Sequence, residues 1–367
     1  MNKLLQFILV AALSISSSML AFGQDRDIKW VQTVGGTSHD HGRAIQVDGS
    51  GNVYTLGHFS APSATFGTAS LSTTGIGTYL TKYSSTGAFL WARKISDTNI
   101  TDEGALKTDA AGNSYVVTSF TGSTTQGSTL TSSGSSDIII VKYNTRGTVV
   151  VGTRAGGTGA DVGTGITIDA SGNSYITGSY SGTGSFGNTT LTSAGDKDGF
   201  VAMLNASGTF VWAQKIGGAA ADEGRGIAID ADGGVYVAGN FNGNFTFGMT
   251  QLTHGGNQDI FLAAYTSGGI PKWASRAGSS NRDRVNGLGI DAAGNLYLGG
   301  HFTGAPTFGS GISIANSGSQ DIFLAKYNSS GTALWATKAG GGGTEELHGL
   351  HVDKDGILYL TGSYSGN

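Results

Sequence analysis

Short runs of alternating apolar and polar residues recur along the chain, each closed by Gly, Asn, Asp or Ser. Residues 226–230 and 235–239 flank one tight turn, and residues 259–265 and 271–278 flank a second. Runs of this length, joined by turn residues, predict β-strands paired as hairpins. No helical period follows the N-terminal segment, so we expect an all-β fold.

One phrase of about twelve residues, of the form DASGNSYITGSY, is repeated six times. Its first residue falls at Asp48, Asp109, Asp169, Asp230, Asp291 and Asp353, at intervals of 60 to 62 residues. A second series keeps the same step and comprises Trp30, Trp91, Val151, Trp212, Trp273 and Trp335. A period near 60 residues is too long for one coil of a β-solenoid and suits a sheet of several strands.

Each repeat contains two hairpins, whose four strands we call a, b, c and d in chain order. The connection from b to c is longer and usually carries Thr-Phe-Gly or Ser-Phe-Gly, at 65–67, 185–187, 246–248 and 307–309. Four antiparallel strands with an aromatic residue at a fixed place predict a blade of a β-propeller, with Trp and Tyr packed between blades. The second repeat is irregular, because residues 124–128 lack the phrase and Val151 replaces Trp.

The strand count predicts six blades, the last one incomplete. A first d strand around Trp30 precedes any a strand, and only five c strands follow, near Tyr79, Ile138, Phe200, Phe261 and Phe323. We therefore expect residues 24–367 to be a propeller domain truncated at its C-terminus.

The second half of the repeat resembles the SBBP repeat of secreted bacterial proteins. The fullest match is DIFLAKYNSSGTALWATKAGG, at residues 321–341, and the resemblance covers about residues 27–367. It implies an extracytoplasmic β-propeller, and it implies no particular activity.

The N-terminus is typical of a secretory signal peptide, residues 1–23. Lys3 precedes a largely apolar segment, and small residues at 21 and 23 form a cleavage site before Gln24. A membrane anchor is the alternative, but the apolar part is short and interrupted by serines. No later segment is long enough to span a membrane, so we expect a mature protein that is secreted or held at the cell surface.

The amino-acid composition excludes some fold classes and some kinds of binding partner. The chain has 63 Gly, only 3 Pro, no Cys and a net charge of −4. This excludes collagen and disulfide stapling, and it gives no basic surface for nucleic acid. The fold must therefore be held by its core.

The repeated turn Asp has two interpretations. The turns at Asp230 and Asp353 begin like an EF-hand calcium loop, but Phe241 and Tyr364 occupy the twelfth position, where that loop needs a carboxylate. The alternative is a hairpin turn in which Asp accepts backbone N–H bonds and Gly takes a positive φ.

A second acidic series lies in the d-to-a loops. It comprises Asp40, Asp102, Asp161, Asp222, Asp283 and Glu345, eight residues before the turn Asp, or seven for Asp102. These carboxylates would surround the channel mouth and bind a cation or a basic ligand. Alternatively, each one fixes its own loop through hydrogen bonds to the backbone.

Histidines give one candidate metal site. If the ring closes, His39 and His41 come near His348, with Asp40 and Glu345 as further ligands. No ligand spacing here is diagnostic of a metal.

The predicted function is a non-catalytic binding scaffold, without a cofactor, for an extracellular protein or glycan. The alternative is a propeller enzyme, a lyase, a hydrolase or a quinoprotein-like oxidoreductase, with its site on the face of the d-to-a and b-to-c loops. The hairpin at 326–335 resembles the Trp-bearing hairpins of quinoprotein dehydrogenases, but no vicinal cysteines accompany it.

Overall fold

The structure is a computed structural model that describes residues 28–98, 103–309, 311–353 and 356–365. Every regular element in these ranges is a β-strand, as the alternating pattern predicts. No helix in the described ranges has the length and apolar character of a membrane span.

Five antiparallel units of four strands follow one another along the chain, each in the spatial order a, b, c, d. Blade one comprises β2 (Asp40–Val47), β3 (Val53–Ser60), β6 (Ile76–Tyr83) and β7 (Phe89–Thr98). Blade two comprises β8 (Ala105–Thr108), β9 (Ser114–Phe120), β12 (Asp137–Tyr143) and β13 (Val149–Gly157). Blade three comprises β14 (Val162–Ile168), β15 (Ser174–Tyr180), β18 (Asp198–Leu204) and β19 (Phe210–Ile216).

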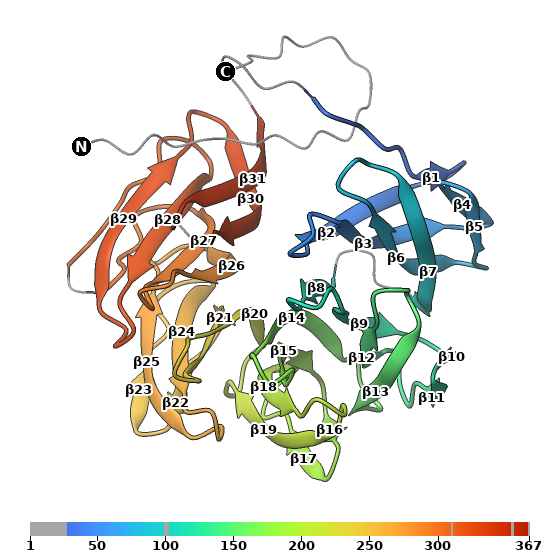
Figure 1. Cartoon of the computed structure of the whole chain (residues 1–367). Helices are drawn as coiled ribbons and strands as arrows, with labels where there is room; N and C mark the ends of the chain where they lie inside the picture. The colour runs from blue at the N-terminus through green and yellow to red at the C-terminus, as the bar shows by residue number, and fades with distance from the viewer. Residues whose placement is uncertain (1–27, 99–102, 310, 354–355, 366–367) are drawn as a thin grey trace.

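Blade four comprises β20 (Asp222–Ile229), β21 (Val235–Phe241), β24 (Asp259–Tyr265) and β25 (Pro271–Ala277). Blade five comprises β26 (Asp283–Ile290), β27 (Leu296–Phe302), β28 (Asp321–Tyr327) and β29 (Ala333–Ala339). Figure 1 shows these units arranged around one axis, with the a strands innermost. This arrangement confirms a β-propeller of four-stranded antiparallel blades.

The sixth unit has two described strands, β30 (Thr344–Val352) and β31 (Leu358–Ser365), which pair only with each other. Strand β27 is buried along its whole length between its two neighbours, whereas β31 is half-buried or exposed. Within the described ranges no strand joins β31 to blade one, so the sheets do not close into a ring (Figure 1).

Small hairpins occupy the b-to-c connections, which the sequence pattern did not predict as strands. They are β4 (Ser63–Phe66) with β5 (Ala69–Ser72), β10 (Ser123–Gln126) with β11 (Ser128–Thr131), β16 (Thr183–Phe186) with β17 (Thr189–Thr192), and β22 (Phe245–Phe247) with β23 (Thr250–Leu252). One of these hairpins also pairs with the end of the preceding d strand, through β16 and β13. In blade one, the short strand β1 (Gly35–Gly36) pairs with β4 in the same way.

The phenylalanine of the Thr-Phe-Gly phrase anchors the hairpin to its blade. Phe66 is fully buried, with its ring centroid 4.6 Å from that of Tyr79. In blade two, buried Gln126 takes this place. Its amide donates to the carbonyl of Ile95 at 2.6 Å and accepts from the Tyr143 hydroxyl at 2.8 Å. The irregular blade therefore replaces an aromatic contact with hydrogen bonds.

In blades one, three and four the repeated tryptophan joins the d strand to the next blade, as predicted. Trp91 Nε1 donates to the carbonyl of Thr145 at 3.1 Å, and the equivalent bonds run from Trp212 to Ser267 and from Trp273 to Ser329. Each acceptor lies in the c–d turn of the following blade. The indole thus contributes a hydrogen bond as well as apolar contact between blades.

Residues 28–34 do not form the predicted d strand, since they have no strand pairing. They nevertheless lie where such a strand would contact blade one. Trp30 Nε1 donates to the carbonyl of Ser85 at 3.2 Å, and Gln32 donates to that of Gly87 at 2.8 Å. A d strand needs a neighbouring c strand to pair with, and the described residues offer none at this place.

The a–b turns confirm the hairpin interpretation of the repeated Asp. The Asp230 carboxylate accepts from the backbone N–H of Asp232 and Gly234, and Gly233 has φ +82°. The Tyr236 hydroxyl also donates to Asp230, at 2.7 Å. The same Tyr–Asp bond recurs at Tyr54, Tyr115, Tyr175, Tyr297 and Tyr359.

Candidate ligand-binding face

One face of the propeller carries the d-to-a loops and the b-to-c hairpins, because every a strand runs away from it and every b strand returns. The tight a–b and c–d turns lie on the opposite face. We call the first the bulge face and the second the turn face.

A β-bulge interrupts the inner strands of blades one, three, four and five and of the sixth unit. The register with the b strand shifts at Gly42/Ala44, Gly163/Gly165, Gly224/Gly226, Val285/Gly287 and Leu347/Gly349. The residues inserted at these bulges are Arg43, Thr164, Arg225, Asn286 and His348. A bulge residue is left out of the ladder and redirects its side chain, which is why bulges often border functional sites.

The bulge residues differ in charge although the strands around them repeat. The residue two places earlier varies too, as His41, Val162, Glu223, Arg284 and Glu346. The variation between blades is therefore concentrated at one end of the inner strands.

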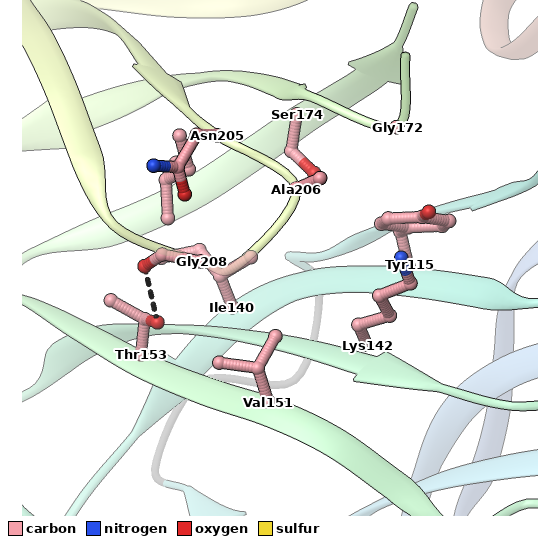
Figure 2. Close-up of a pocket in the computed structure, with 11 residues that line it drawn as sticks. Tyr115, Ile140, Lys142, Val151, Thr153, Gly172, Ser174, Asn205, Ala206 and Gly208 are labelled. Atoms are coloured by element: carbon pink, nitrogen blue, oxygen red, sulfur yellow. Dashed lines mark hydrogen bonds between the residues drawn. The ribbon is translucent and has the colours of Figure 1, made fainter. Parts of the chain in front are cut away.

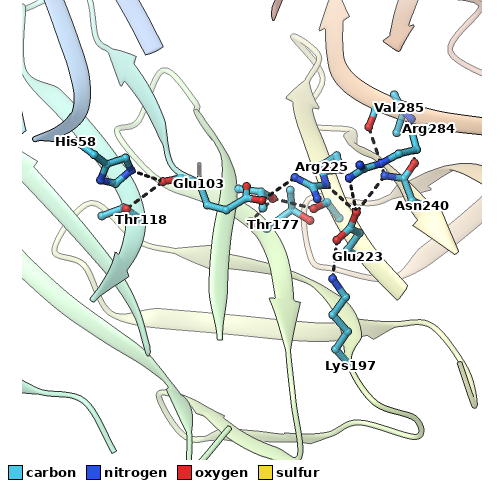
Figure 3. A network of polar contacts seen from close by, with 12 residues as sticks. His58, Glu103, Thr118, Thr177, Lys197, Glu223, Arg225, Asn240, Arg284 and Val285 are labelled. Carbon is cyan, nitrogen blue, oxygen red and sulfur yellow. Dashed lines mark hydrogen bonds and ion pairs between the residues drawn. The ribbon is translucent and has the colours of Figure 1, made fainter. Parts of the chain in front are cut away.

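Charged side chains from four blades meet on this face (Figure 3). Arg225 Nε donates to Glu223 at 2.8 Å, and its Nη1 donates to Glu103 of blade two at 2.9 Å. Lys197 donates to Glu223 at 2.7 Å, and Arg284 of blade five lies 3.5 Å from it. Because Arg225 reaches past blade three, the network crosses the inner end of that blade.

The charges in this network hold one another ionised. Burial alone would raise the pKa of Glu223, but Arg225 and Lys197 lower it to about 2. Burial alone would lower the pKa of Arg225. The Glu223 and Glu103 carboxylates have a larger effect in the opposite direction, so the pKa of Arg225 is raised. Asn240 completes the site by donating to Glu223 at 3.2 Å. Removing one member would leave its partners buried and uncompensated.

The predicted d-to-a acids that the structure describes take no part in the ion pairs of this network. Asp161, Asp222 and Asp283 are 0% exposed. One oxygen of each accepts a backbone N–H from four residues earlier, and the same bond occurs at Asp40 and Glu345. These bonds hold each loop in place, and the binding of a cation or a basic ligand by the acids stays a prediction. Asp102 lies outside the described residues.

The d-to-a acids lie near a carboxylate of the preceding blade rather than near one another. Burial raises the pKa of Asp161 to about 6, and the nearby Asp137 carboxylate acts in the same direction. Asp198 acts likewise on Asp222, and Asp259 on Asp283. These three c-strand acids are themselves fully buried. Each blade junction from two to five therefore encloses a pair of carboxyl groups.

The candidate metal ligands are not assembled in the described ranges, where no three His, Asp or Glu side chains come together as a metal site. His39 and His41 are exposed beside Asp40. His348, in the sixth unit, forms a hydrogen bond of 3.1 Å with Ser363 Oγ.

A small pocket lies between blades two and three (Figure 2). It occurs where Val151 replaces the tryptophan of other blades, and Thr153 donates to the Gly208 carbonyl beside it at 2.8 Å. Mostly apolar atoms and turn backbone line it, so we attribute it to packing.

Comparison with known proteins supports the fold. Residues 211–246 match the model of the SBBP family, described as a beta-propeller repeat. The chain is 24% identical to an uncharacterised WD repeat-containing protein of Acanthamoeba polyphaga mimivirus, over 93% of this chain. It spans about a third of that protein's length, with 31% covered.

Two solved structures are similar at low sequence identity. The Neurospora crassa Pan2 WD40 domain is 9% identical, with a TM-score of 0.41 over 89% of this chain and 90% of that one. Kuenenia stuttgartiensis hydrazine synthase is 12% identical, with a TM-score of 0.46 over 88% and 94%. Residues 211–246 thus carry the SBBP beta-propeller repeat, and the same blade plan recurs through the described chain.

Proposed function

We propose that this chain is a binding scaffold that recognises an extracellular protein or glycan through its bulge face. The observation that carries the proposal is the concentration of differing charged side chains at the bulges of otherwise repeated strands. Packing alone requires no such variety, because Thr164 fills the same place in blade three with two bonds to backbone carbonyls.

The proposal includes a ring of six blades, secreted or displayed at the cell surface. Residues 28–34 support the ring, because they contact blade one as the d strand of a preceding blade would. The signal-peptide pattern supports export, and it predicts a mature chain that begins at Gln24.

A ligand array of glycans and extracellular proteins tests the binding function. The bulge-face variant carries Glu103→Gln, Glu223→Gln and Arg225→Gln, which remove charge while keeping hydrogen-bonding groups. The turn-face control carries Arg146→Gln and Asp232→Asn, two exposed positions on the opposite face.

We expect the wild type and the turn-face control to bind the same ligands, and the bulge-face variant to bind them at least tenfold more weakly. Circular dichroism would verify that each variant is folded. Equal binding by the bulge-face variant, or no bound ligand on the array, would contradict the proposal.

A further inference from the structure

The charges of the bulge face are unevenly satisfied. Glu223 receives Lys197 and Arg225 at normal hydrogen-bond distances, and Arg225 also binds Glu103. Arg284 reaches Glu223 only at 3.5 Å. Within this network three cations therefore face two carboxylates, and Arg284 is the cation with the weakest partner.

Two buried nitrogen atoms at this place lack a hydrogen-bond partner among the described residues. They are Nε of Arg284 and Nδ1 of His301. Arg284 and His301 are direct neighbours across the β26–β27 pair, and His301 is only 6% exposed. Buried polar groups are almost always paired, so such a group of unpaired atoms requires an explanation.

In blades one and four the residues equivalent to His301 do have partners, whereas Ser119 Oγ of blade two is also unpaired within the described ranges. Asn240 stands at the place of His301 in blade four, and it bonds with the backbone N–H and C=O of Val285. His58 holds this place in blade one and bonds with Thr78 and the carbonyl of Glu103. Blade five thus differs from blades one and four, where the imidazole or amide at this position is hydrogen-bonded.

The electrostatic environment favours an anion. Burial lowers the pKa of Arg284, and the nearby Arg225 lowers it further. Burial lowers the pKa of His301 to about 4, and the nearby Arg284 guanidinium is the second cause of this shift. Arg282 and His348 act in the same direction as Arg284 on His301, and only Glu346 opposes them. Positive charge is therefore in excess here, and a cation would be repelled.

We propose that Arg284 and His301 form a subsite that binds a carboxylate group of the ligand. The guanidinium donates to the carboxylate oxygens, a pairing for which its planar geometry is well suited. The imidazole supplies a second donor through its Nδ1–H tautomer. This subsite rests on the proposed function and specifies part of the ligand.

The experiment uses two carboxylate probes with neutral counterparts. Methyl glucuronide represents an acidic sugar and is compared with methyl glucoside. N-acetyl-aspartate amide represents an acidic peptide side chain and is compared with N-acetyl-asparagine amide. The arginine Nε–H and histidine ring signals of the full chain are followed by NMR during titration.

We expect at least one acidic probe to shift the Arg284 and His301 signals saturably, while both neutral probes leave them unchanged. The preferred acidic probe identifies sugar or peptide as the source of the carboxylate. Arg284→Gln should weaken binding at least tenfold, whereas Arg146→Gln, an exposed arginine on the turn face, should have no effect. His301→Gln should retain part of the affinity.

Binding should also raise the pKa of His301, because an anion beside the ring stabilises its protonated form. A merely structural role for Arg284 would not give this shift. The subsite is refuted if neither acidic probe shifts the Arg284 signal, or if Arg284→Gln binds as the wild type does. Even if the subsite is refuted, loss of array binding by the bulge-face variant would still support the proposal that this face binds a ligand.

Discussion

Trp212 and Trp335 occupy the same place in their blades but have different surroundings. Trp212 is buried against the c–d turn of blade four, with its ring centroid 6.5 Å from that of Tyr265. Trp335 is 37% exposed, because no described turn covers it. The contribution of one repeated residue therefore depends on the presence of the next blade.

Replacing each tryptophan with alanine should separate these two situations. We expect Trp212→Ala to lower the free energy of unfolding by about 3–5 kcal/mol, as large buried aromatics do. Trp335→Ala should cost about 1–2 kcal/mol, since it buries less apolar area. Urea denaturation measures both, and equal losses would show that Trp335 is as enclosed as Trp212.

The residues of the core and turns could be predicted from sequence, and the charged site could not. Asp230 and Trp212 recur at fixed spacing, so their roles follow from repetition. Glu223 and Arg284 deviate from the repeat, and nothing in the sequence says that they meet across blades. Their contact depends on the tertiary arrangement of the inner strands.

At the scale of the element, the c–d turn is both a hairpin connection and a surface for the preceding tryptophan. Gly269 has φ +78°, and a Cβ there would lie 2.6 Å from an indole carbon of Trp212. Gly309 also has a positive φ, +68°, but a Cβ there would meet nothing within 4 Å. Both glycines have a positive φ, but only at Gly269 would an added Cβ lie against another side chain.

Comparing alanine substitutions at Gly269 and Gly309 isolates the contribution of the contact between Trp212 and the c–d turn of the next blade. Gly309→Ala should cost about 1–2 kcal/mol, the strain of a positive φ in a residue with a side chain. Gly269→Ala should cost about 2 kcal/mol more, because it also displaces Trp212 from its packed position. Thermal denaturation followed by tryptophan fluorescence would measure this difference, and equal costs would argue against tight packing of the indole on the turn.

The spacing between the d-to-a acid and the turn Asp indicates the inner-strand bulges, although the alternation of apolar and polar residues does not. In blade two the d-to-a acid, Asp102, precedes the turn Asp by seven residues, whereas the other blades have eight. Strand β8 is also the inner strand that shows no register shift. The extra residue is the bulge. Alternation could not place it, since a bulge breaks the period of two.

At the scale of the whole molecule, the buried carboxyl pairs make stability depend on pH. Asp161, Asp222 and Asp283 have pKa values of about 6 in the folded chain, above their ordinary value of 3.8. The folded state therefore binds these protons more tightly than the unfolded state does. Their contribution to stability is full below pH 3.8 and is lost as the pH rises through 6.

We expect the unfolding free energy to rise by about 1 kcal/mol for each of these carboxyls as the pH falls from 7.5 to 5. Glu223 acts in the opposite sense, because its pKa is lowered to about 2 from 4.5. Its contribution is present above pH 4.5 and is lost as the pH falls toward 2. His301 also opposes the rise, because its pKa is lowered to about 4 from 6.5 and the unfolded chain takes up its proton first as the pH falls. The carboxyl contribution is therefore best measured on a variant that lacks one of the three carboxyls.

Denaturation between pH 3 and 8 measures this profile. Asp222→Asn should remove about 1 kcal/mol of carboxyl stabilisation that the wild type gains between pH 7.5 and 5, while Asp232→Asn, at an exposed turn, should not. An Asp222→Asn variant whose stability changes with pH as that of the wild type does would contradict the proton-binding account.

The bulges also affect how such a molecule evolves. A bulge residue is unpaired in the ladder, so substituting it leaves strand register and the hydrophobic face unchanged. The side chains at Arg43, Thr164, Arg225, Asn286 and His348 can therefore change without a change in strand pairing. Duplicating blades multiplies positions that selection can alter one at a time, and specificity can diverge while the architecture stays constant.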